Sequence, residues 1–145
     1  MQDLPHHYNV SATGTDTGSI TLSASRVPDI SSAPPSEFGG PGDQWSPESL
    51  LVAAVADCFI LTFRAIARAS KLDWTNLECS AEGTLDRVDR VTRFTAVTIT
   101  ATLTVPAGTE AEKAEKLLHK AEDNCLITNS LNVDPQLTTH VNHSA

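Results

Sequence analysis

Two stretches in the second half of the chain alternate apolar and polar residues with the two-residue period of a β-strand. In residues 93–105, threonine alternates with Val, Ile, Ala and Leu, and residues 75–85 alternate in the same way. The polar, turn-like residues 86–92 separate the two stretches. We therefore predict an antiparallel pair of strands with one buried face. The apolar positions of this face are Leu77, Cys79, Ala81, Leu85, Val97, Ile99, Ala101, Leu103 and Val105.

A long helix is predicted before these strands. Ser46 suits the N-cap, Pro47 suits the first helical position, and Glu48 suits the positive end of the helix dipole. The helix is expected to reach about Ser70. Apolar residues occupy all of its faces rather than one stripe, a pattern typical of a buried helix. A chain of this size can hardly surround such a helix, so a second subunit is the expected cover.

The remaining pattern predicts shorter elements. Residues 7–13 and 19–27 form an expected N-terminal hairpin, and the Pro- and Gly-rich residues 28–45 an expected loop. Thr109 is the expected cap of a second helix that ends near Asn124. A short edge strand is expected at residues 137–141. The order ββ-α-ββ-α-β indicates an α+β fold.

Length and charge narrow the functional class. The 145 residues suit a single domain, 1–145. A net charge of −8 disfavours nucleic-acid binding and docking to an anionic membrane, both of which need clustered cations. The N-terminus lacks the pattern of a signal peptide, and the low-charge residues 49–63 are too few to span a bilayer. We expect a cytoplasmic protein without a membrane partner, whose thiols stay reduced.

The three cysteines differ in their predicted positions. Cys58 lies within the apolar helix, Cys79 on the buried face of a strand, and Cys125 at the end of the second helix. Neither a Cys-x-x-Cys motif nor a Cys/His cluster with metal-ligand spacing is present, so no metal site is expected. For Cys58 two interpretations remain open: a buried cysteine that acts as a small apolar residue, or a reactive thiol.

Two sequence motifs carry a resemblance to a known family. Residues 46–51 read Ser-Pro-Glu-Ser-Leu-Leu, residues 56–58 read Ala-Asp-Cys, and residues 38–42 before them read Phe-Gly-Gly-Pro-Gly. A second cysteine motif, residues 125–131, follows 67 positions after Cys58. Together these motifs resemble the OsmC/Ohr family of thiol-dependent organic hydroperoxide reductases. The resemblance spans nearly the whole chain, including its order of elements.

The resemblance implies a fold and a chemistry. It implies an intertwined homodimer with long, centrally buried helices and active sites at the interface. Cys58 would attack the peroxide and become a sulfenic acid, Cys125 would form a disulfide with it, and an external dithiol, rather than a bound cofactor, would reduce the disulfide. Glu48 matches a glutamate of the family's active site. Ten helical residues span about 15 Å, so Glu48 would have to act on a Cys58 of the other subunit.

The chain departs from the family pattern at two places. Peroxidase members hold an arginine beside the reactive thiol, yet residues 28–47 contain no Arg or Lys. Arg26 is the candidate that the first hairpin offers, whereas Arg64 and Arg68 are expected to stabilise the helix end or to face solvent. Leu126 stands where the family usually has proline. Asp57 is a further feature, because a carboxylate close to the Cys58 thiol would raise its pKa.

Three functions remain open at the level of sequence. The leading hypothesis is a cysteine-based peroxidase that reduces organic hydroperoxides. The alternative is an OsmC-like fold that binds a small apolar ligand with weak or no peroxidase activity, which the missing arginine would favour. The third is a purely structural interaction protein, in which both cysteines would be replaceable.

Overall fold

The computed structural model describes all residues, 1–145, and the chain falls into two compact units, Met1–Leu50 and Leu51–Ala145. The first unit is built on a three-stranded antiparallel sheet of order β1-β2-β3. Its strands are β1 (Ser11–Thr13), β2 (Ile20–Ser23) and β3 (Ile30–Ser32), followed by the 3-10 turn η1 (Ser36–Phe38). The predicted hairpin is present with shorter strands. The prediction that residues 28–45 are only loop is wrong, because β3 pairs with β2 within them.

Helix α1 (Pro47–Ala69) begins where the sequence predicts it. The Ser49 N–H donates to Ser46 Oγ over 3.1 Å, and the Ser46 N–H donates to Ser49 Oγ over 2.9 Å. This reciprocal pair satisfies backbone donors that have no partner inside a helix. The predicted N-cap Ser46 is therefore confirmed.

The second unit is built on a three-stranded sheet of order β4-β5-β6. Strands β4 (Asn76–Val88) and β5 (Val91–Val105) are antiparallel, as predicted. Asp89 and Arg90 join them with positive φ angles of 51° and 68°, the backbone conformation of a tight two-residue hairpin turn. Strand β6 (Gln136–His143) is an edge strand, as predicted, and runs parallel to β5.

Two helices connect β5 to β6, which is the kind of crossover that parallel strands need. These are α2 (Ala111–Asp123) and the short α3 (Leu126–Asn129), which the sequence pattern did not predict. The N-cap of α2 is Glu110 and makes no side-chain hydrogen bond, so the prediction of a Thr109 cap is wrong. The predicted α+β class is confirmed.

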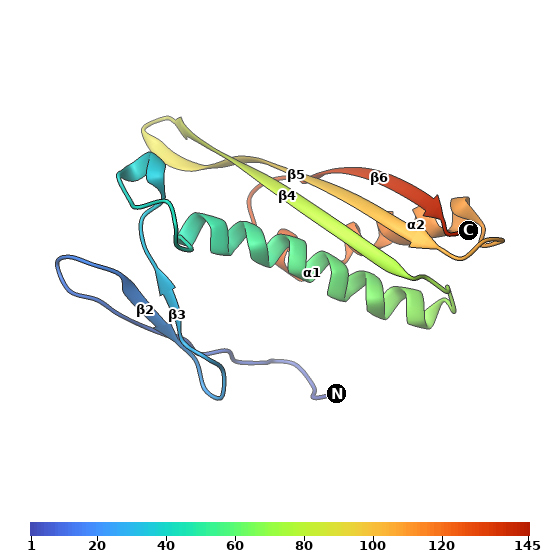
Figure 1. The fold of residues 1–145 in the computed structure, drawn as a ribbon, viewed down its shortest axis with the longest axis horizontal. Helices are drawn as coiled ribbons and strands as arrows, with labels where there is room; N and C mark the ends of the chain where they lie inside the picture. The colour runs from blue at the N-terminus through green and yellow to red at the C-terminus, as the bar shows by residue number, and fades with distance from the viewer. The chain divides into compact units, whose positions relative to one another are not determined.

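Helices α1 and α2 cover the same face of the β4-β5-β6 sheet (Figure 1). The alternate residues of β5 from Val97 to Val105 point into this core and are almost fully buried. Phe63 packs edge-on against Trp74, with ring centroids 5.5 Å apart, a favourable aromatic geometry. The buried residues of the two helices are Val55, Phe59, Phe63, Ala67, Ala114, Leu117, Leu118 and Ala121.

Only one stripe of α1 is buried in this core. The buried positions recur every four residues, whereas Leu61 is 50% exposed. By length and composition α1 is apolar enough to cross a membrane, a property that the core helix of a soluble protein can share. Much of its apolar surface is thus uncovered within one chain. The second subunit that would cover it stays a prediction.

Candidate active site

Cys58 lies near the middle of α1, one position before the buried Phe59. Its side chain is half-buried and lines a groove of about 500 Å³. The walls of the groove come from α1 and from the start of α3, and most of them are apolar. The lining residues are Ala54, Asp57, Cys58, Leu61, Thr62, Ala65, Leu126 and Ile127.

Cys125 is completely buried at the junction of α2 and α3. Its N–H donates to the Glu122 carbonyl over 3.2 Å, and the Thr128 hydroxyl donates to its carbonyl over 3.1 Å. These bonds fix the residue where the chain turns toward α1. The two thiols lie close enough for each to shift the pKa of the other, and both are free. The structure thus brings together Cys58 and Cys125, which are far apart in sequence.

The surroundings of Cys58 favour its thiolate. Burial opposes ionisation, but the N–H groups of Ile127 and Leu126, the Cys125 thiol and the Thr62 hydroxyl all hydrogen-bond to the sulfur, so the pKa of Cys58 lies below its ordinary value. Asp57 lines the same groove. The carboxylate therefore does not bring about the rise in the Cys58 pKa that its position in sequence suggests.

The pKa values of the other two thiols are shifted upward. Burial raises the pKa of Cys125, and the facing Cys58 raises it further. Burial, together with the charge of Cys125, raises the pKa of Cys79 to about 11. In the Cys58–Cys125 pair, Cys58 therefore loses its proton first, while Cys125 remains a thiol.

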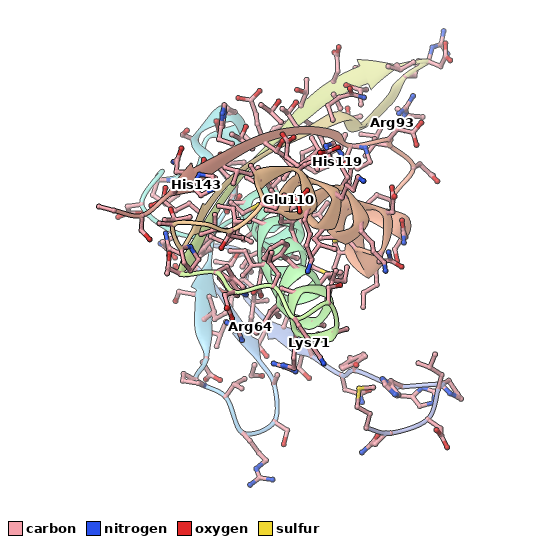
Figure 2. All side chains as sticks on the ribbon, turned by 90° about the vertical axis from the view of Figure 1, so that its right-hand side faces the viewer. Arg64, Lys71, Arg93, Glu110, His119 and His143 are labelled. Atoms are coloured by element: carbon pink, nitrogen blue, oxygen red, sulfur yellow. The ribbon has the colours of Figure 1, made fainter.

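No arginine or lysine lines the groove around Cys58. Arg64 and Arg68 are exposed on α1, as expected, and Figure 2 shows Arg64 well apart from Arg93 of β5. Arg26 is exposed in the turn after β2, within the unit Met1–Leu50. Within the unit that carries Cys58, neutral hydrogen-bond donors rather than a cation stabilise the thiolate.

Glu48 lies in the first turn of α1, within the unit Met1–Leu50. It lines a pocket of about 320 Å³ whose other walls come from the same unit, among them Ser32 and Phe38. Its Oε1 atom is buried and has no hydrogen-bond partner. An unpaired buried carboxylate oxygen is costly.

Sequence reasoning identified the two cysteines but missed Thr62 and the backbone of residues 126–127. Thr62 follows Cys58 by four residues, which places both side chains on one face of a helix. The spacing alone could therefore have predicted that Thr62 lies close to Cys58. The backbone donors were not readable, because they depend on the short helix α3 that the pattern did not predict.

The chain is similar to known proteins in both sequence and structure. The family model for OsmC-like proteins matches residues 40–140. The uncharacterized protein YmaD of Bacillus subtilis is 28% identical, covering 94% of this chain and 95% of the relative. An OsmC-like protein of unknown function from Vibrio cholerae has a similar structure, with a TM-score of 0.84 at 19% identity over 93% of this chain and 99% of that one.

A second solved structure is more similar in sequence. It is that of an organic hydroperoxide resistance protein from Legionella pneumophila, described as a predicted redox protein. Its TM-score is 0.78 at 26% identity, over 96% of this chain and 100% of that one. The family match covers well over half of the chain and includes both cysteine motifs.

Proposed function

The chain belongs to the OsmC-like protein family, and from this premise we propose that it is a thiol-dependent peroxidase that reduces organic hydroperoxides to alcohols. The observation that carries the proposal is the pairing of Cys58 with Cys125. A half-exposed thiol with a lowered pKa lies in an apolar groove, close enough to a second free thiol that each shifts the pKa of the other. This is the environment of a reactive cysteine next to a resolving one.

The proposed reaction has two steps on the protein. The Cys58 thiolate attacks the distal peroxide oxygen, the O–O bond breaks, and the leaving alkoxide takes a proton to become the alcohol. Cys58 is then a sulfenic acid. Cys125 attacks the Cys58 sulfur, the S–O bond breaks, and the hydroxide leaves with the Cys125 proton as water. An external dithiol reduces the resulting disulfide, so the cycle needs no bound cofactor.

The groove supports an organic rather than an inorganic peroxide as substrate. Leu61, Ala65 and Ile127 present apolar surface beside the sulfur, and apolar surface favours an alkyl or aryl group. As part of the same proposal we place the protein in the cytoplasm, where a dithiol pool is available.

A homodimer completes the proposal. A second copy packed along α1 would cover its exposed apolar faces, including Leu61. Glu48 of that copy is the residue we assign to the Cys58 site, since ten helical residues, about 15 Å, separate the two within one chain. The unpartnered Oε1 of Glu48 supports the presence of a second copy near the start of α1, because it needs a donor that one chain does not supply.

The activity is tested by following the consumption of cumene or tert-butyl hydroperoxide in the presence of a dithiol. Cys58→Ser should abolish turnover, because serine is a far weaker nucleophile at neutral pH. Cys125→Ser should react for a few turnovers and then stop, with Cys58 over-oxidised to the sulfinic acid. Mass spectrometry of the peptide that contains Cys58 detects the added oxygens.

Cys79→Ser is the matched control, since Cys79 is a cysteine of the same chain whose pKa of about 11 keeps it protonated. It should retain wild-type turnover. A wild-type protein that consumes no more hydroperoxide than Cys58→Ser would overturn the proposal. In that case the apolar groove favours the alternative function, binding of a small apolar ligand. A fluorescent apolar probe that binds the wild-type protein but not Leu61→Glu would reveal this binding.

A further inference from the structure

A hydroxyl group lies beside the reacting sulfur on the same helix. Thr62 Oγ1 is 3.7 Å from Cys58 Sγ, within the longer range of hydrogen bonds to sulfur. The two residues are four positions apart, so their side chains share one face of α1. Both line the groove that we assign to the hydroperoxide.

We propose that Thr62 is a further functional residue of this site, whose hydroxyl donates a hydrogen bond to the Cys58 thiolate and so prepares the sulfur for attack on a peroxide. The catalytic consequence rests on the proposed peroxidase function, whereas the effect on the thiolate does not. The residue has no counterpart among the site residues predicted from the sequence motifs.

The argument begins with which atom is the donor. A hydroxyl both donates and accepts, and the thiol S–H is a weak donor. The contact is therefore weak while Cys58 is protonated and becomes a charge-assisted bond once the sulfur is ionised. A bond that is stronger in the charged state shifts the equilibrium toward that state. This agrees with the direction of the pKa of Cys58, to which Thr62 contributes.

The setting makes this contribution matter. No cation lines the groove, so the negative charge depends on neutral donors. The β-branched side chain of Thr62 is restricted to two χ1 rotamers in a helix, and in the one present its hydroxyl lies beside the Cys58 sulfur. A fixed donor costs little reorganisation when the charge forms.

The contribution should be greatest in the reduced enzyme. Once Cys58 becomes a sulfenic acid or a disulfide, its sulfur carries no charge, and the bond from Thr62 weakens. The hydroxyl should therefore accelerate the reaction with peroxide.

The test measures the pH dependence of Cys58 alkylation by iodoacetamide, followed by mass spectrometry of the Cys58 peptide. Thr62→Val keeps the shape and removes the hydroxyl. It should move the midpoint to higher pH and lower the alkylation rate below that midpoint by about three- to tenfold, the net effect of one typical intramolecular hydrogen bond. Thr62→Ser retains the hydroxyl and should stay within about twofold of wild type.

The peroxide step provides a second readout. In Thr62→Val, kcat/KM for hydroperoxide should fall by a similar factor. An alkylation midpoint in Thr62→Val equal to that of wild type would overturn the inference. If Thr62→Val does not fold, as judged by circular dichroism, Thr62→Ala serves in its place.

The inference and the proposed function fail separately. Alkylation requires no turnover, so a chain inactive toward hydroperoxides can still show the Thr62 effect on the thiolate. Conversely, the protein could be an active peroxidase whose alkylation midpoint is the same in Thr62→Val and wild type. That result would support the proposed function and contradict the role of Thr62.

Discussion

The three cysteines of this chain are the same side chain in three environments. The sulfur of Cys58 meets several hydrogen-bond donors, and its pKa falls. Cys125 faces Cys58 from a fully buried position, and its pKa rises, while burial and the charge of Cys125 raise the pKa of Cys79 to about 11. Reactivity at the residue scale is thus decided by the donors around each sulfur rather than by the thiol itself.

Leu126 gives the first test at this scale. Its N–H is one of the donors to Cys58, and it occupies the first position of α3. Cys125, the residue before it, has an extended backbone with φ of −71° and ψ of 107°. Proline is well tolerated at this position and has no N–H. Leu126→Pro should therefore raise the pKa of Cys58 and slow its alkylation at neutral pH by roughly threefold, measured on the Cys58 peptide.

Leu126→Ala is the control for the lost side chain, which is 65% exposed. It retains the N–H and should leave the alkylation midpoint at the wild-type pH. Equal midpoints for the proline and alanine variants would mean that the Leu126 amide does not stabilise the thiolate.

The site residues could be predicted only in part from the sequence. Cys58 and Cys125 stand in motifs that can be recognised from the order of residues alone. The donors that set the Cys58 pKa cannot be recognised in this way. A backbone N–H is present at nearly every residue, and only the folded path of the chain directs it toward the sulfur. The expected arginine shows the same limit, since its absence from residues 28–47 does not reveal what replaces it.

At the scale of elements, the inner face of β4 brings Cys79 into the core built by α1 and α2. The folded state raises the pKa of Cys79 from 9.0 to about 11 through burial and the charge of Cys125. Between these two pH values the unfolded chain has lost the proton that the folded chain still holds. The free energy of unfolding should therefore fall as pH rises through this window. Below the window the titration of Cys79 should not change the free energy of unfolding.

Urea unfolding of wild type and Cys79→Ala, at one pH below and one pH above this window, measures the effect. Lysine and tyrosine residues also titrate there, so the informative quantity is the difference between the two proteins. The alanine variant should be less stable at the lower pH because it loses buried volume, and the gap should narrow at the higher pH. A gap that stays constant across the window would contradict the prediction.

The predictability of the elements follows their length. Strands β4 and β5 and helix α1 each repeat their pattern over many residues, so the sequence predicts them well. Strand β3 and helix α3 have three and four residues, too few to show a period, and they form because neighbouring segments offer partners. Pairing with β2 fixes β3, and the local bonds around Cys125 fix α3.

At the scale of the whole molecule, α1 presents two features that one chain leaves unsatisfied. Its apolar faces away from the sheet are only partly covered, and only 22% of its most apolar stretch of 18 residues is buried. Near its start, Glu48 Oε1 is buried without a partner. A second copy packed along α1 would resolve both, by covering apolar surface and by supplying polar groups near Glu48. The proposed dimer is therefore also a proposal about the completeness of the site.

This proposal predicts complementation between two inactive variants. In a dimer whose sites pair Cys58 of one copy with Glu48 of the other, a mixed dimer of Cys58→Ser and Glu48→Gln chains contains one site with both native residues. Differently tagged chains, co-expressed and purified through both tags, should therefore show about half of the wild-type hydroperoxide turnover. Each variant alone should be nearly inactive. If both residues act within one chain, every site of the mixed dimer carries a substitution, and its turnover would stay at the level of the single variants.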